Sequence, residues 1–153
     1  MVELTQAGAE FLTFTLGPET YAIDILAVQE IRAFDGATPI AHAPAFIKGV
    51  MNLRGEIVPL ADLRLKFGIG EARYDDYTIV VVLNVGRRVV GVVVDSVSDV
   101  IRLTPDAIRP VPEMNSAIDL RYMRGLAGHE GQMVILLDIE DLMLSADMAL
   151  FDA

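Results

Sequence analysis

The feature that most constrains this chain is a pair of apolar runs around a glycine turn that occurs twice, with the turns 69 residues apart. The first copy turns at Gly17-Pro18 and the second at Gly86-Arg87. Apolar runs separated by turn residues are typical of β-hairpins. The same spacing relates three residues after the first hairpin to three after the second: Val28 to Val97, Glu30 to Asp99, and Ile31 to Val100.

A second block of the sequence repeats with a spacing of 76 residues. Two repeated blocks in the same order indicate an internal duplication, in which each copy holds a hairpin, a strand, a connector, a second hairpin and a short helix. Two unrelated β-meanders are the alternative. The residues related by the second spacing are Gly49 and Gly125, Gly55 and Gly131, Val58 and Val134, Leu60 and Leu136, and Asp62 and Asp138.

Each copy is too short to bury a sufficient core alone, because small units leave too much of their surface exposed. We therefore expect the copies to share a hydrophobic core within a single domain, residues 1–153. Several short strands at regular spacing favour small β-barrels. The sequence predicts a first barrel at about residues 11–75 and a second at about residues 76–153, which includes a C-terminal helix.

Two short stretches have helical signals. Asp62 is placed to cap a helix that runs through Leu65 and Phe67 and ends at Gly68. Near the C-terminus, apolar residues recur at spacings of three and four, which favours one helix or two short ones packed on a barrel. These residues are Ile139, Leu142, Met143, Ala146 and Leu150.

Composition restricts the function before any motif is considered. With 12 basic and 22 acidic side chains the formal net charge is −10. This charge argues against a dedicated nucleic-acid binder, because such proteins neutralise phosphates with Lys and Arg. The chain has no cysteine, which excludes disulfides, zinc–thiolate sites, iron–sulfur clusters and a cysteine nucleophile, and which fits the cytosol best.

The most apolar stretch, residues 79–94, does not predict a membrane span. Two arginines and an asparagine interrupt it, and it is shorter than the roughly 20 residues of a spanning helix. Its many β-branched residues favour strands. The first ten residues contain two glutamates, no Lys or Arg and no long apolar run. We therefore expect neither a secretory signal nor direct membrane insertion.

No residue pattern predicts catalysis. His42 and His129 are far apart in sequence and have no other histidine or cysteine at metal-ligand spacing, so neither predicts a metal site. The Gly68-Ile69-Gly70 segment lacks the third glycine and the Lys-Ser/Thr ending of phosphate-binding loops, and Gly-x-Ser-x-Gly is absent. We expect a binding or structural module without a cofactor; a small enzyme of an unfamiliar class is the alternative.

The segment from Ala43 to Leu63 is the best candidate for partner contact. Gly49 and Gly55 bound a β-segment where tight or left-handed backbone is needed, and Pro59 favours a sheet edge or a bulge. Arg54 is a cation in an otherwise apolar stretch, so it needs a carboxylate partner from this chain or from a binding protein. Because edge strands can meet other proteins, this segment is a candidate interface.

At this segment the sequence resembles the CheW family, the adaptor proteins of bacterial chemotaxis. The resemblance covers about residues 10–152, and its motifs are together highly specific. The family's fold implies a mainly β chain of two five-stranded SH3-like β-barrels that share a hydrophobic core, with short helices. The motifs are Asn52-Leu53-Arg54-Gly55, Tyr21-Ala22-Ile23-Asp24-Ile25, Val28-Gln29-Glu30-Ile31-Arg32, Val89-Val90-Gly91-Val92-Val93-Val94-Asp95 and Val97-Ser98-Asp99-Val100.

The resemblance implies binding without catalysis. Such an adaptor couples the cytoplasmic tip of methyl-accepting chemoreceptors to the regulatory domain of the histidine kinase CheA, and so supports receptor control of autophosphorylation. The resemblance also implies rings of alternating adaptor and kinase domains in the cytoplasm beneath the receptor array. An adaptor of another chemosensory pathway, such as surface motility, with its own kinase is the alternative, and weak self-association in rings stays open.

Carried over residue by residue, the resemblance implies two contact regions. Glu30 belongs to the receptor-binding set and occupies, with Arg54, the position of an ion pair beside a groove between the barrels. The second half has Gly128-His129-Glu130-Gly131 in place of the Asn52 to Gly55 segment, so the barrels need not present equivalent surfaces. The groove residues are Val28, Ile31, Ile79, Val97 and Val100. The residues of the kinase-contact region are Gly49, Asn52, Leu53, Arg54 and Gly55.

Overall fold

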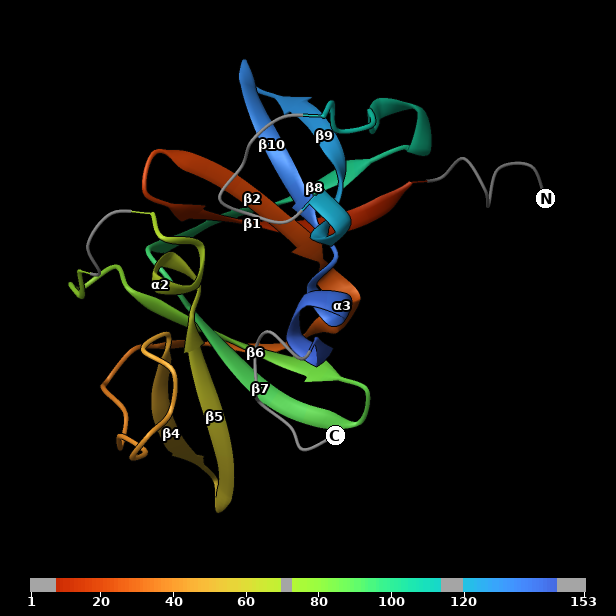
Figure 1. The fold of residues 1–153 in the computed structure, drawn as a ribbon. Helices are drawn as coiled ribbons and strands as arrows, with labels where there is room; N and C mark the ends of the chain where they lie inside the picture. Colours follow the sequence, from red (N-terminus) through yellow and green to blue (C-terminus); the bar gives the residue numbers. More distant parts are fainter. Residues whose placement is uncertain (1–7, 70–72, 114–119, 146–153) are drawn as a thin grey trace.

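The computed structural model describes residues 8–69, 73–113 and 120–145, which are mainly β-strands (Figure 1). Within these ranges ten strands form two five-stranded sheets, with strand orders β8-β1-β2-β10-β9 and β3-β6-β7-β5-β4. The first sheet contains β1 (Ala9–Leu16), β2 (Glu19–Asp24), β8 (Ser96–Leu103), β9 (Met123–His129) and β10 (Gln132–Leu137). The second contains β3 (Val28–Ala33), β4 (Ile47–Leu53), β5 (Glu56–Asp62), β6 (Ile79–Val85) and β7 (Arg88–Val94).

In the described residues, short helices lie between strands or follow the last one. They are α2 (Leu63–Phe67) and α3 (Ile139–Leu144), with the 3-10 turns η1 (Ile25–Ala27), η2 (Pro105–Ala107) and η3 (Leu120–Tyr122). The C-terminal helix expected from the sequence is therefore present as α3. Ala146 and Leu150, which the same apolar spacing includes, lie outside the described residues, as do residues 1–7.

Both helices begin at the aspartates that the repeat relates to each other. The Asp62 carboxylate accepts a hydrogen bond from the backbone N–H of Leu65 at 3.1 Å, and α2 ends at Gly68, which has a φ of 67°. The Asp138 carboxylate accepts from the N–H of Asp141, also at 3.1 Å, and caps α3. A side-chain acceptor at this position satisfies an N–H that has no partner within the helix.

The duplication predicted from the sequence is visible in the order of elements. A shift of 69 residues places β1, β2 and β3 on β6, β7 and β8, and a shift of 76 residues places β4, β5 and α2 on β9, β10 and α3. Each hairpin turn contains a glycine with positive φ, as two-residue hairpin turns require. Two unrelated β-meanders would not produce this correspondence.

The two copies exchange hairpins, so the sheets do not divide the chain into consecutive halves. The first hairpin, β1–β2, pairs with β8 and, in parallel, with β10 of the second copy. The second hairpin, β6–β7, pairs with β3 and, in parallel, with β5 of the first copy. One sheet therefore takes residues 9–24 and 96–137, and the other takes residues 28–94.

This arrangement corrects the expected division of the barrels at residues 75 and 76. Apolar alternation and turn residues indicate where strands begin and end. They do not indicate which copy a hairpin pairs with, because the matching strands of the two copies have the same pattern. The exchange is therefore a property of the pairing and not of any single segment.

The hydrophobic core has three parts. The largest lies between the barrels and contains residues of both central hairpins, among them Phe14, Tyr21, Val81 and Val92. A smaller cluster fills each barrel. The central hairpins are thus buried on both faces, which explains why residues 79–94 are almost continuously apolar. The core shared by the two copies is the one expected from their small size.

Pro59 does not mark an edge strand, because β5 lies between β4 and β7. Pro59 stands opposite Val50 of β4, and the parallel pairing of β5 with β7 begins only at Leu60. The N–H and C=O groups of Val50 bond to Thr38, so β4 needs no donor from Pro59. A proline is tolerated where the sheet requires no N–H. The edge strand of this segment is β4.

Candidate partner-binding site

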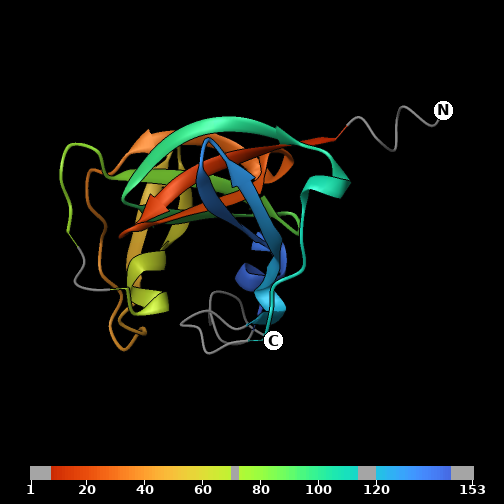
Figure 2. The same cartoon turned by 90° about the horizontal axis from the view of Figure 1, so that it is seen from above.

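The apolar residues that the sequence assigned to a groove lie on β3, β6 and β8. We call them the inter-barrel face. Strands β3 and β8 are edge strands of the two sheets, and Figure 2 shows them, in orange and green, along the same side of the molecule. The inter-barrel face consists of Val28, Ile31, Ile79, Val97 and Val100.

On β3, the inter-barrel face lies on the side of the strand that meets the shared core. Val28 stands opposite Leu83 of β6, and Ile31 stands opposite Val81. Both partners belong to the shared core. Since residues directly opposite each other project from the same face of a sheet, Val28 and Ile31 continue that core outward.

The same arrangement recurs on β8. Val97 stands opposite Phe14 of β1, and Val100 stands opposite Leu12. Phe14 and Leu12 also belong to the shared core, and Ile79 at the start of β6 packs against it. The five residues therefore share one surface, although they come from three strands and from both copies of the repeat.

A β-bulge on each edge strand allows residues three positions apart to share a face. In a regular strand, Val28 and Ile31 would project from opposite faces. The register skips Gln29 on β3 and Ser98 on β8. One extra residue shifts the alternation by one position. Gln29 and Ser98 are related by the spacing of 69, so both copies of the repeat contain the same bulge.

The inter-barrel face runs from the core to the surface. Val28, Ile79 and Val97 are half-buried and pack against the shared core. Ile31 and Val100, which the repeat relates to each other, are 43% and 44% exposed. Apolar side chains that are anchored on one side and open on the other can receive apolar residues of a partner helix.

The ion pair implied by the resemblance is present between β3 and the turn that joins β4 to β5. One guanidinium nitrogen of Arg54 lies 2.5 Å from Glu30 Oε1, and the other lies 3.4 Å from Oε2. The hydrogen bonds from Arg54 hold the pKa of Glu30 below its ordinary value of 4.5. The pair is therefore complete at neutral pH and is lost only as the pH falls through that lowered pKa.

The turn from Asn52 to Gly55 presents Arg54 at the end of the β4–β5 hairpin. Arg54 and Gly55 have φ values of 52° and 90°, and positive φ at both central positions is what a type I′ hairpin turn requires. The side-chain oxygen of Asn52 accepts a hydrogen bond from the N–H of Gly55 at 2.7 Å. This bond and the ion pair fix the direction in which the hairpin presents its charge.

Two residues assigned to the kinase-contact region lie in the interior. Leu53 is only 3% exposed and belongs to the core of its barrel. Gly49 is buried, has a φ of 133°, and has no room for a side chain, since a Cβ would lie 2.0 Å from the backbone oxygen of Thr38. These two residues support the shape of the hairpin from within, whereas Asn52, Arg54 and Gly55 are exposed.

Sequence analysis did not identify Ile57 beside this turn. Ile57 is 62% exposed and stands opposite Asn52 in the β4–β5 pair. The signal for it is the alternation of the strand: Val58 and Leu60 are buried in the barrel, so Ile57 faces outward. Met133, its counterpart in the second copy, is also an exposed apolar residue beside the corresponding turn.

The corresponding turn of the other barrel has a different surface, as expected from its sequence. His129 takes the place of the buried Leu53, and its Nε2 lies 4.0 Å from the carboxylate of Glu130. Glu130 takes the place of Arg54 and has the opposite charge. A partner that binds one turn through charge would therefore be repelled by the other.

Two negative findings apply to residues 8–69, 73–113 and 120–145. No group of three or more histidine, aspartate or glutamate side chains is arranged there to hold a metal ion. The helices in these ranges are all too short or too polar to cross a membrane.

Comparison with known proteins identifies the family. The CheW-like domain matches residues 10–147 of this chain. The chain belongs to the CheW family. The chemotaxis protein CheW of Klebsiella aerogenes is 57% identical over 145 residues, which cover 95% of this chain and 87% of that protein. The chemotaxis protein CheW of Rhizobium meliloti is 35% identical over 144 residues, which cover 94% and 93%.

A solved CheW structure has the same fold. The crystal structure of the scaffolding protein TtCheW from Thermoanaerobacter tengcongensis matches with a TM-score of 0.83 and 30% sequence identity, covering 92% of this chain and 90% of that one. The match extends over both sheets. The family recognised in the sequence and the predicted fold class, two five-stranded SH3-like barrels with a shared core and short helices, are both confirmed.

Proposed function

We propose that this CheW-family chain is a non-catalytic adaptor that couples chemoreceptors to the histidine kinase CheA. Membership of a family whose members are named chemotaxis and scaffolding proteins supports this role. The observation that carries the proposal is the inter-barrel face, where two bulged edge strands hold four apolar side chains, and β6 adds Ile79, between the shared core and the surface. A second surface is the turn from Asn52 to Gly55, which the Glu30–Arg54 ion pair joins to the inter-barrel face.

The receptor contact in this proposal uses the inter-barrel face. An amphipathic helix binds a groove by placing residues spaced three and four apart against apolar positions. Ile31 and Val100 are the exposed positions that meet such residues, and Val28 and Val97 form the base beneath them. Glu30 borders the apolar surface with a charge, and a polar rim of this kind is typical of protein interfaces.

The kinase contact in this proposal uses the exposed part of the β4–β5 turn. Asn52, Arg54 and Gly55 meet the regulatory domain of CheA, while Gly49 and Leu53 support the shape of the hairpin from within. Two distinct faces on one small protein allow rings of alternating adaptor and kinase domains, and many modest contacts then stabilise the array. The protein acts in the cytoplasm at the membrane-associated receptor array.

Receptor-stimulated autophosphorylation tests the proposal directly. Receptor-containing membranes and CheA are assayed with and without this protein. A large increase in phosphorylated kinase that attractant suppresses is the expected result. An absence of stimulation, with the protein folded and the same partners responding to another adaptor, would reject coupling in that pathway. The same assay with a different chemosensory kinase then tests the alternative role in another pathway, such as surface motility.

A charge swap tests whether the Glu30–Arg54 pair contributes to stability or to partner binding. We expect Glu30→Arg and Arg54→Glu each to lower the free energy of unfolding only slightly, because the pair is at the surface, where solvent screens its charges. The double variant restores the ion pair but places the new guanidinium beside Arg32, so it should recover part of the lost stability, while receptor and kinase binding stay impaired. Thermal melting and pairwise binding of all three variants measure the two effects.

The charge swap has a control in the second barrel. Glu130→Arg changes the charge at the corresponding turn, so it should leave stability and receptor binding at wild-type values. Full recovery of partner binding in the double Glu30→Arg and Arg54→Glu variant would show that the pair is only structural.

A further inference from the structure

The chain crosses between the two sheets at two related points that are built differently. The first crossover follows β2 and passes through η1, and the second follows β7 at Asp95. The spacing of 69 relates Leu26 in the first crossover to Asp95 in the second. Leu26 is 88% exposed. In that first crossover, among the residues that the structure describes, the Asp24 carboxylate accepts a hydrogen bond only from the N–H of Leu26 itself. Asp95, in contrast, bonds to two other elements of the fold, so within the described residues only the second crossover is held by an ion pair.

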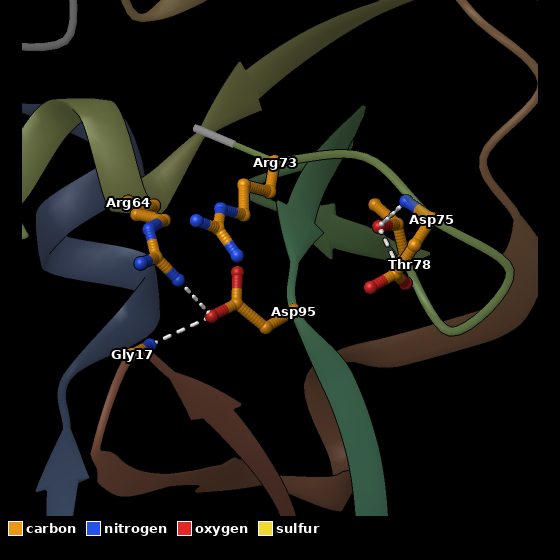
Figure 3. A pocket seen from close by; sticks show the side chains of 6 residues that line it. All are labelled: Gly17, Arg64, Arg73, Asp75, Thr78 and Asp95. Atoms are coloured by element: carbon orange, nitrogen blue, oxygen red, sulfur yellow. Dashed lines mark hydrogen bonds and ion pairs between the residues drawn. The ribbon is translucent and has the colours of Figure 1, made fainter. Parts of the chain in front are cut away.

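Asp95 joins elements of both sheets (Figure 3). Its carboxylate accepts a hydrogen bond from the backbone N–H of Gly17 at 2.7 Å, and it forms an ion pair with the guanidinium of Arg64. Gly17 lies in the β1–β2 turn of one sheet, and Arg64 lies on α2, which follows the other sheet. We call Gly17, Arg64 and Asp95 the clasp. The Arg73 guanidinium also points toward Asp95 from the loop before β6.

The clasp is partly shielded from solvent. The side chains of Arg64 and Asp95 are 19% and 25% exposed, and they line a polar hollow of about 440 Å³. On the far side of the hollow, Asp75 and Thr78 hydrogen-bond to each other. The Nε of Arg64 is buried without a hydrogen-bond partner in the described chain. Because Arg64 depends on Asp95, loss of that carboxylate would leave a shielded cation that must move.

The clasp lies at the start of the strand that carries half of the inter-barrel face. Asp95 precedes Val97 by two residues, and its N–H donates to the backbone oxygen of Thr15 at 3.0 Å. The hydroxyl groups of Ser96 and Thr15 lie 2.7 Å apart. These bonds set the direction in which β8 begins, just before the bulge at Ser98. The start of β3, which carries Val28, follows the crossover without a clasp.

We propose that the clasp positions the β8 half of the inter-barrel face for receptor binding. Asp95 holds the start of β8 to α2 of the other barrel, and so keeps Val97 and Val100 in register with the β3 half. This inference rests on the proposed function, because it assigns the clasp to the receptor contact. Asp95 and Arg64 are positioning residues that need not touch the receptor themselves.

The test compares Asp95→Asn, Arg64→Gln and the double variant in binding to a purified receptor cytoplasmic fragment. We expect each single variant to bind about tenfold more weakly, which is within the usual range of coupling between two sites. The double variant should bind no more weakly than either single variant, because all three lose the same clasp. Binding to CheA should stay at the wild-type value, since the β4–β5 turn is not part of the clasp.

Two measurements make the outcome decisive. Asp76→Asn removes the same charge from an exposed loop and should leave receptor affinity unchanged. Because the chain has no cysteine, spin labels can be placed on β3 and β8 through Ala33→Cys and Arg102→Cys. The distance distribution between them should broaden in Asp95→Asn. This readout needs no receptor, so it distinguishes a failure of the clasp from a failure of the proposed function.

Unchanged receptor affinity and an unchanged distance distribution in a folded Asp95→Asn variant would overturn the inference. If Asp95→Asn does not melt cooperatively, Arg64→Lys is tested in its place. This variant keeps the positive charge but loses the planar guanidinium that can donate two hydrogen bonds to one carboxylate. Loss of cooperative melting in Arg64→Lys as well would make the clasp a general folding element and would also overturn the inference. An equal loss of receptor and CheA binding has the same meaning.

Discussion

Gly49→Ala should lower the free energy of unfolding by about 2 to 6 kcal/mol, the sum of an overpacking and a backbone-strain cost. The added Cβ would lie 2.0 Å from the backbone oxygen of Thr38, and the φ of 133° is rarely adopted by residues with a side chain. The Thr38–Val50 bridge that covers β4 would have to open. Urea denaturation followed by circular dichroism measures the change.

Gly128→Ala is the matched control. Gly128 lies in β9 and is exposed, and a Cβ added there would meet no atom within 4 Å beyond its own chain neighbours, so this variant should unfold like the wild type. A Gly49→Ala protein as stable as the wild type would contradict the packing argument. If such a stable protein also failed to bind CheA, Gly49 would be a contact residue and not a support for the hairpin.

The positions of the strands could be predicted because each depends on local signals. Apolar runs, glycine turns and the repeat at spacings of 69 and 76 are all visible along the chain, and so are the capping aspartates Asp62 and Asp138. The exchange of hairpins could not be predicted this way. Pairing β1 with β8 instead of β3 depends on contacts between the copies, and both strands offer the same apolar pattern.

The sequence points to the residues of the candidate site, but it does not show which of them share a face or which are buried. Val28 and Ile31 are three residues apart, a spacing that in a regular strand separates them, and only the bulge at Gln29 brings them to one face. Leu53 and Arg54 are neighbours in the sequence, yet one fills a barrel and the other is exposed. A tight turn changes the direction of successive side chains, so burial there depends on the turn geometry.

Val100→Asp should reduce receptor-stimulated autophosphorylation to the level seen without the adaptor. Val100 is 44% exposed on the edge strand β8, so the protein should lose less than about 1 kcal/mol of stability. Receptor binding, in contrast, would place the new carboxylate against apolar side chains without a partner, which costs several kcal/mol. Val97→Asp is a weaker test, because Val97 packs on the shared core and its loss would also disturb the fold.

The repeat supplies an independent second variant. Ile31 is the counterpart of Val100 on β3 and is equally exposed, so Ile31→Asp should have the same effect on receptor coupling. Tyr77→Asp places the same charge on an exposed apolar residue of the loop before β6 and should leave stimulation intact. If both face variants fold, melt cooperatively and still stimulate the kinase, the receptor does not bind between the barrels. If only one of the two variants is impaired, the receptor contacts only the edge strand that carries that residue, although both copies of the repeat contribute an exposed apolar residue to the face.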